Sequence, residues 1–334
     1  MDRPGPENTI RLSASDRGIR AAVALLKNGQ EVAFPTETVY GLGADARRAD
    51  AVAGIYRAKG RPHFNPLIVH VSEIRLARQL AEFNTVVEAL AEAFWPGPLT
   101  LVLPRRADTA LSDLVTAGLD TLALRVPAHD LARRLLSAFD GPLAAPSANP
   151  SGRISATTAD HVMDNLGGQI AGVLDGGPTG IGLESTIVGL VDGKPRLLRP
   201  GGLSVEAIEA VLGAPLAEAK DTQVSAPGQL ASHYAPKAQL VLNAEVADAG
   251  ALWLAFGPLN GRRGLSLSEG RDLSVAAAQL FGHLHELDEL ARESGADRVL
   301  VDPVPKEGLG LAINDRLQRA AAPRDADVAV MPSR

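Results

Sequence analysis

The sequence of 334 residues contains no cysteine, which excludes disulfides, thiolate nucleophiles and zinc sites with cysteine ligands. The seven histidines show no His-Glu-x-x-His spacing, and no Walker A motif is present, because the glycines and lysine at 189–195 have the wrong spacing. No stretch approaches the roughly 18 uninterrupted apolar residues that a membrane helix needs. These absences favour a cytoplasmic enzyme or binding protein with no membrane association.

Basic residues are outnumbered, with 33 Lys and Arg against 39 Asp and Glu and a formal net charge of −6. Any contact with nucleic acid must therefore come from a local basic patch, because counterion release needs clustered cations. The length exceeds the roughly 100 to 200 residues of one domain, so two domains are expected.

A local cluster of cations lies at 57–61, where Arg57, Lys59 and Arg61 fall within five positions. The preceding segment has helical spacing, Gly60 is suited to a left-handed residue that ends the helix, and the proline at 62 prevents continuation. Lys59 and Arg61 are then predicted on either side of a fixed turn, where they could bind a polyanion. The alternative is that these cations only complement the helix dipole.

The segment 121–126 is predicted to be a strand in which Thr121, Ala123 and Arg125 share one face and the leucines share the other. An arginine between apolar neighbours needs an anion, and a guanidinium binds a carboxylate through two hydrogen bonds. Both an internal Asp or Glu and a ligand carboxylate fit this argument. His70 also interrupts an apolar strand, where a histidine with satisfied core contacts is the common case.

The segment 146–152 carries two serines and an asparagine after a predicted strand. These residue types favour turns, and they are also the donors that a neutral phosphate cradle needs. The glycines at 41 and 43 follow another strand without completing the dinucleotide fingerprint, so they are expected to allow close approach of backbone or ligand.

Helices and strands are predicted to mix irregularly, which is typical of a large twisted mixed sheet with helices packed on it. A helix capped by Asp16 is expected to run through Leu26. Further helices are expected after Ser72 and Asn84, and at 129–139 and 158–166. Strands are expected at 31–34, 67–71, 99–103, 121–126, 142–145, 170–174, 186–191 and 196–198. Periodicity disappears at 213–238, which predicts a linker. Strands at 239–242, 251–256 and 298–301 with helices at 274–294 and 311–321 then predict a small three-layer α/β domain.

Several segments resemble the threonylcarbamoyl-AMP synthase family, whose catalytic domain has the YrdC-like fold. The resemblance rests on FPTETVYGLG at 34–43, KGRP at 59–62, NPLIVH at 65–70, LRVP at 124–127, SAN at 147–149, STIV at 185–188 and LRPG at 198–201. These segments occur in family order within 16–212. The later SHYAP at 232–236 and the α/β tail look like the longer members of the family.

The resemblance implies a fold of the α/β (α+β) class, with a YrdC-like twisted mixed sheet and a smaller Rossmann-like C-terminal domain. Residues 1–15 would be an N-terminal extension and 16–212 the catalytic domain. Residues 213–238 would be a linker that crosses the active site, and 239–334 would be the C-terminal domain.

The activity implied is that of an L-threonylcarbamoyladenylate synthase, a nucleotidyltransferase that joins L-threonine, bicarbonate and ATP into threonylcarbamoyl-AMP and releases pyrophosphate. The product would supply threonylcarbamoyladenosine modification of tRNA through a downstream threonylcarbamoyl transferase machinery. Mg²⁺ would arrive with ATP, and no protein metal ligand is assigned.

Site residues carry over by motif from the same resemblance. Lys59 and Arg61 would be the catalytic cations at the ATP phosphates. The other ATP-binding residues would be Asn65, Thr121, Ser147, Ser155, Arg199 and Tyr234. Threonine would be surrounded by Thr38, His70, Arg125, the backbone near Ala145, and Ser185. Tyr234 and its linker would exclude water from the labile adenylate. No general base for threonine is identified.

Two other functions fit the fold. YrdC-like domains present a basic concavity that could hold double-stranded RNA, so an RNA-binding module, or weak RNA binding beside the enzyme activity, is one alternative. The other is a carbamoyl-transfer domain of hydrogenase maturation. That context would bring zinc-finger segments, which a chain without cysteine lacks.

Overall fold

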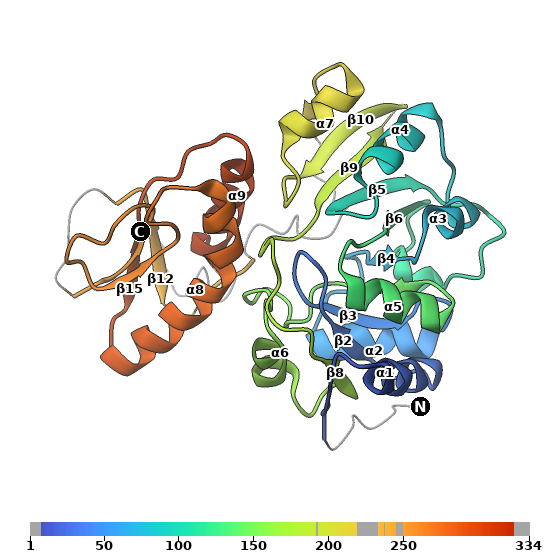
Figure 1. Cartoon of the computed structure of the whole chain (residues 1–334), viewed down its shortest axis with the longest axis horizontal. Helices are drawn as coiled ribbons and strands as arrows, with labels where there is room; N and C mark the ends of the chain where they lie inside the picture. The colour runs from blue at the N-terminus through green and yellow to red at the C-terminus, as the bar shows by residue number, and fades with distance from the viewer. Residues whose placement is uncertain (1–7, 192, 219–232, 237, 245–249, 324–334) are drawn as a thin grey trace, which may run out of the picture. The chain divides into compact units, whose positions relative to one another are not determined.

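The structure, a computed structural model, describes residues 8–191, 193–218, 233–236, 238–244 and 250–323 (Figure 1). Its contacts divide the chain into two compact units. The first comprises Met1–Ser151 and Ser155–Gln229, and the second comprises Gly152–Ile154 and Leu230–Arg334. Within the described residues, no helix has both the length and the apolar character that a membrane span requires.

The described part of the first unit contains one mixed sheet with the strand order β1-β8-β2-β3-β7-β4-β6-β5-β9-β10-β11. The strands are β1 (Ile10–Leu12), β2 (Val32–Phe34), β3 (Gly41–Asp45), β4 (Ile68–His70), β5 (Leu99–Pro104), β6 (Thr121–Arg125), β7 (Leu143–Ala144), β8 (Gly172–Leu174), β9 (Thr186–Val191), β10 (Lys194–Arg199) and β11 (Ala217–Glu218). Parallel and antiparallel pairs alternate irregularly along it. The predicted twisted mixed sheet is confirmed.

Helices cover both faces of this sheet. They are α1 (Asp16–Lys27), α2 (Ala49–Lys59), α3 (Ile74–Leu80), α4 (Thr85–Phe94), α5 (Asp130–Phe139), α6 (Ala159–Leu166) and α7 (Val205–Leu212), with a 3₁₀ turn η1 (Asp113–Val115). Helices α1 and α5 pack on the face that carries Val32 and Phe34. Ala33, between them, points into the larger core beneath α2, α3, α4 and α6, because successive strand residues face opposite sides.

The central strands carry a third, smaller apolar cluster of Ile68, Val102, Ala123 and Ile187. The leucines that flank Ala123 in β6 lie in the larger core instead. The predicted alternation of 121–126 is therefore confirmed, and Arg125 lies on the same face as this small cluster.

Local signals at α1 and α2 explain their ends. Helix α2 ends at Lys59, and Gly60 adopts the left-handed conformation with φ 57° and ψ 35°, as predicted. The prediction that Asp16 caps α1 is wrong by one residue. Ser15 is the N-cap, because its side-chain oxygen accepts a hydrogen bond from the Gly18 N–H.

Strand β3 was not predicted, because its two glycines disfavour a strand. A Cβ at Gly43 would lie 2.8 Å from the Phe34 ring, so the glycine is needed where an aromatic ring crosses the neighbouring strand. Strands β1 and β11 lie within the segments predicted as extension and linker, and they pair in parallel with β8 and β10. Helix α7 was also missed.

The second unit contains a parallel sheet with the order β12-β15-β13-β14. Its elements are β12 (Gln239–Leu242), β13 (Leu252–Ala255), β14 (Gly264–Ser266), α8 (Leu273–Ser294), β15 (Arg298–Val301) and α9 (Leu309–Ala321). The predicted small α/β domain is confirmed, although β14 was not foreseen. Helix α8 stops where Gly295 takes φ 71°, as expected for a glycine after a helix.

Tyr234 is part of the interior of the second unit. Its side chain is buried, and its ring centroid lies 5.3 Å from that of Phe281 in α8. The guanidinium of Arg316 in α9 lies 5.3 Å from the same ring, which is within cation–π range. The His233 N–H donates to the Arg319 carbonyl at 3.1 Å. The segment 233–236 is therefore held by the helices of this unit.

Candidate active site

Four neighbouring strands of the first unit each bring one polar side chain to the same face of the sheet. They are His70 at the end of β4, Arg125 at the end of β6, Thr100 in β5 and Ser185 directly before β9. His70 and Arg125 are partners in the parallel β4–β6 register. All four side chains are at most 3% exposed. Polar groups so deeply buried need partners, which makes this row a candidate binding site.

Arg125 is surrounded by acceptors. Its Nη1 donates to the Thr38 hydroxyl at 2.9 Å and its Nε to the Gly97 carbonyl at 3.1 Å. Its Nη2 lies 2.6 Å from a carboxylate oxygen of Glu37. Of the two anions that the sequence left open for Arg125, the structure therefore shows the internal one. Glu37 was not predicted as a site residue, although it lies inside the FPTETVYGLG segment.

The charge state of Glu37 reflects opposing effects. Burial raises the pKa of its carboxyl group, but attraction and hydrogen bonding to Arg125 and the nearby backbone N–H groups of Glu37 and Ala128 outweigh burial and lower that pKa. Glu37 is therefore ionised at neutral pH. The pair places opposite charges side by side where little solvent reaches them.

His70 is held as a neutral imidazole. Burial and the positive charge of Arg125 lower the pKa of His70 from 6.5 to about 3. The ring meets Phe34 edge-on with a centroid distance of 6.2 Å. Its Nδ1 atom is buried and has no hydrogen-bond partner among the described residues. The neutral ring can thus give or accept a hydrogen bond without adding charge beside Arg125.

Ser185 and Arg199 meet beside this row. The Arg199 Nη2 donates to the Ser185 carbonyl at 2.7 Å, and the Ser185 hydroxyl lies 2.7 Å from the hydroxyl of Thr100. Ser185 was assigned to threonine and Arg199 to ATP by motif, and the structure brings the two together. Thr100 was missed, because one threonine within an apolar strand gives no distinctive signal.

Lys59 lies at the end of α2 and is only 3% exposed. Its Nζ donates to the Ser147 carbonyl at 2.6 Å and to the Asn149 carbonyl. Burial and, to a lesser degree, the charge of Arg61 lower the pKa of Lys59 well below its usual value, while Glu184 acts in the opposite direction. A lysine so placed gains from an added anion, because negative charge favours its protonated form.

Arg61 points inward. It donates to the Asn65 side-chain oxygen at 2.7 Å, and to the carbonyls of Asn65 and Pro66 at 3.1 and 2.8 Å. The amide nitrogen of Asn65 is buried without a hydrogen-bond acceptor among the described residues. The structure thus confirms the fixed turn after α2 and shows that Arg61 braces the loop that follows it.

The remaining predicted residues lie at four places. Ala145 and Ser147 follow β7, where the Ala145 N–H donates to the Ile68 carbonyl at 2.8 Å. The Ser155 hydroxyl donates to Glu184 at 2.6 Å, one residue before Ser185. Thr121 starts β6, about 13 Å from Arg125 at the rise of a strand, so it does not join the Arg125 row. Tyr234 belongs to the second unit, and its role at ATP stays a prediction.

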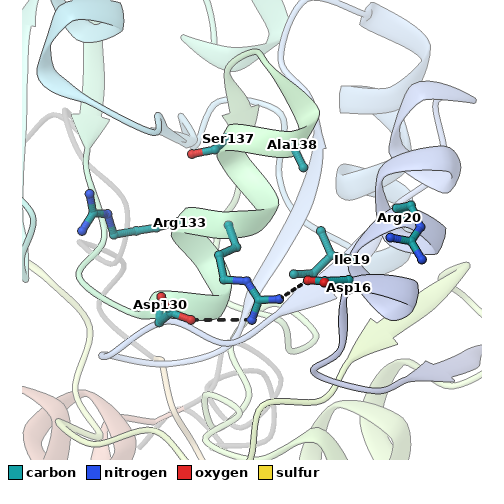
Figure 2. Close-up of a pocket in the computed structure, with 8 residues that line it drawn as sticks. Asp16, Ile19, Arg20, Asp130, Arg133, Ser137 and Ala138 are labelled. Carbon is teal, nitrogen blue, oxygen red and sulfur yellow. Dashed lines mark hydrogen bonds and ion pairs between the residues drawn. The ribbon is translucent and has the colours of Figure 1, made fainter.

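An open groove of about 690 Å³ lies elsewhere, on the outer side of α1 and α5 (Figure 2). Arg134 lines this groove, and its guanidinium lies 2.6 Å from Asp16 and 3.7 Å from Asp130. These charges compensate one another and none belongs to the Arg125 row. Among the described residues, no group of three or more His, Asp or Glu side chains is arranged to hold a metal ion.

Comparison with known proteins adds independent findings. The family model described as "Telomere recombination" matches residues 24–201, and that described as "Threonylcarbamoyl-AMP synthase, C-terminal domain" matches 203–322. Proteins named threonylcarbamoyl-AMP synthase from Bacillus subtilis and Pyrococcus abyssi are 44% and 40% identical to the chain. They align over 95% and 94% of it, and over 96% and 97% of their own lengths. The crystal structure of P. abyssi Sua5 complexed with L-threonine aligns with a TM-score of 0.85 and 38% identity, covering 94% of this chain and 97% of that one.

Proposed function

The chain belongs to the threonylcarbamoyl-AMP synthase family, and we propose that it condenses L-threonine, bicarbonate and ATP into threonylcarbamoyl-AMP and pyrophosphate. The observation that carries this proposal is the buried row of His70, Arg125 and Ser185 on one sheet face, together with a desolvated lysine at the end of α2 in the same unit. An acyl adenylate synthase needs those two features together, because one anchors the acid and the other meets the nucleotide.

Threonine binds at the Arg125 row in this proposal. The guanidinium takes the substrate carboxylate, since a bidentate contact fixes both position and orientation. Thr38 already touches Arg125, and His70 and Ser185 lie on the same face, so neutral donors and acceptors surround the remaining substrate groups. The backbone near Ala145 closes the same pocket from β7.

The ATP phosphates lie toward Lys59 and the loop that follows Arg61. The threonine amine, once it has lost its ammonium proton, attacks bicarbonate and water leaves, which gives a carbamate. Attack of the carbamate oxygen on the α-phosphorus then forms the new P–O bond, and pyrophosphate leaves with the electron pair of the broken one. Negative charge therefore increases on the phosphates, and nearby cations stabilise that change. A unit charge at 4 Å contributes about 4 kcal/mol at an effective dielectric constant near 20, before desolvation is subtracted. Mg²⁺ enters as part of the ATP substrate.

Asn65, Ser147, Ser155, Thr121, Arg199 and Tyr234 complete the nucleotide site in this proposal. Lys59 Nζ joins the end of α2 to the 147–149 loop, so binding of phosphate there would order both segments at once. The product would pass to the machinery that modifies tRNA with threonylcarbamoyladenosine. A cytoplasmic location and weak RNA binding stay predictions.

The deciding experiment incubates the full chain with MgATP, isotopically labelled bicarbonate and L-threonine. Mass spectrometry should detect an adenylate that carries both the label and threonine, with an equal amount of pyrophosphate. Arg125→Gln should abolish the product, whereas Arg75→Gln, an exposed arginine of α3, should leave it unchanged. Pyrophosphate release without labelled adenylate, or normal product from Arg125→Gln, would refute the assignment.

A further inference from the structure

Glu37 is a buried carboxylate whose hydrogen-bonding capacity is unfilled. Both of its side-chain oxygens are buried. The donors that approach them, on Arg125 and on the backbone of Glu37 and Ala128, do so with poor hydrogen-bond geometry. The contact with Arg125 at 2.6 Å is an ion pair to one oxygen. An ionised carboxylate offers about four acceptor positions, so capacity for a further, well-aligned donor remains.

The backbone that carries Glu37 is fixed. The Ile181 N–H donates to the Glu37 carbonyl at 2.8 Å, and the Gly182 N–H donates to the Thr38 carbonyl at 3.1 Å. The Thr36 hydroxyl also donates to the Val39 carbonyl at 2.7 Å. Hydrogen bonds on the residues around Glu37 thus hold the backbone that presents the carboxylate.

Leaving a buried carboxylate short of donors is costly, and the cost falls when a cation with several N–H groups arrives. An α-amino acid carries such a cation next to the carboxylate that Arg125 is suited to bind. Its two charges lie about as far apart as those of a contact ion pair. The Arg125–Glu37 pair therefore presents the complementary charges in the complementary order.

We infer that Glu37 binds the ammonium group of the amino-acid substrate while Arg125 binds its carboxylate. This inference rests on the proposed function, because it names a further residue of the threonine site. It assigns selection for the zwitterion to the pair: acids without an amine leave Glu37 unsatisfied, and amines without a carboxylate leave Arg125 unsatisfied. His129 also interacts electrostatically with Glu37, and burial lowers the pKa of His129 despite that carboxylate.

The test compares binding of L-threonine with binding of 3-hydroxybutyrate, which is threonine without its amino group. Calorimetry or ligand-detected NMR at neutral pH would measure both ligands on the full chain. The unsubstituted protein should prefer threonine by about tenfold or more, as expected for one charge-assisted contact. Glu37→Gln should weaken threonine binding by about the same factor and leave 3-hydroxybutyrate within about twofold.

The outcome distinguishes a ligand contact from a supporting role. If Glu37 only orients Arg125, Glu37→Gln will weaken both ligands equally and preserve the preference, which would overturn the inference. Glu73→Gln removes an exposed carboxylate paired with Arg75 and should change neither affinity. If Glu37→Gln does not fold, as judged by thermal unfolding, Glu37→Met, which also removes the charge, carries the same comparison, and an undiminished preference there refutes the inference. Failure of the unsubstituted protein to bind threonine would instead refute the proposed function.

Discussion

His70 makes the acid stability of the first unit predictable. Because burial and Arg125 lower its pKa from 6.5 to about 3, the folded protein holds this ring neutral where the unfolded chain would protonate it. The contribution of His70 to the free energy of unfolding is constant above pH 6.5, and it falls as the pH decreases from 6.5 toward 3. The integrated proton linkage amounts to about 3 kcal/mol between pH 7 and pH 4.

The measurement is urea unfolding at several pH values, followed by tryptophan fluorescence. The chain has two tryptophans, Trp95 in the first unit and Trp253 in the second, so a Trp253→Phe background leaves one reporter beside α4. His70→Gln in that background should lose about 3 kcal/mol less than the parent between pH 7 and pH 4. Other carboxylates titrate in both proteins and cancel in the difference.

The control is His63→Gln, at an exposed ring that stacks on Tyr56. It should follow the parent curve. Parallel curves for the parent and His70→Gln would show that His70 is not held neutral by its surroundings.

Threonine binding by the parent should stay constant from pH 5 to 8, since neither His70 nor Glu37 changes charge there.

Two further predictions concern burial. Lys59→Met should abolish pyrophosphate release. The unfolding temperature of the ligand-free protein should stay unchanged or rise, because burial already disfavours the charge of this lysine. A large drop in that temperature would contradict the prediction. Gly43→Ala should lower the free energy of unfolding by about 1 to 3 kcal/mol, because it forces a methyl group against Phe34. In the control Gly180→Ala, a Cβ meets nothing within 4 Å, so this free energy should change by no more than about 0.5 kcal/mol. Equal unfolding free energies for the two variants would refute the packing argument.

The fold was largely predictable where a local rule decides the backbone. The end of α2 followed from Gly60, and the faces of β6 followed from strict alternation. Strand β3 failed the same kind of rule, because the glycine at 43 is explained by the ring of Phe34 on the neighbouring strand, which the sequence does not reveal. Strands β1 and β11 failed because very short edge strands carry almost no periodic signal.

The residue types of the site were predictable from the sequence, but the interaction partner of each residue was not. The need of Arg125 for an anion follows from its strand, yet the choice of Glu37 depends on two segments separated by more than 80 residues in sequence. The inward direction of Arg61 was equally hidden, since a basic residue after a helix gives no sign of which carbonyls it will meet. Long-range neighbours decide both cases.

The anchoring of Tyr234 between Phe281 and Arg316 constrains how that phenol could ever reach a nucleotide. In a flexible linker, rotation about a few backbone dihedral angles would be enough to bring the ring to the nucleotide. Here the ring packs inside the second unit, so any contact with a nucleotide requires either that α8 and α9 accompany the ring or that the ring first leaves them. The second route would leave a hole the size of an aromatic side chain, and it would strip the buried Arg316 guanidinium of its π partner.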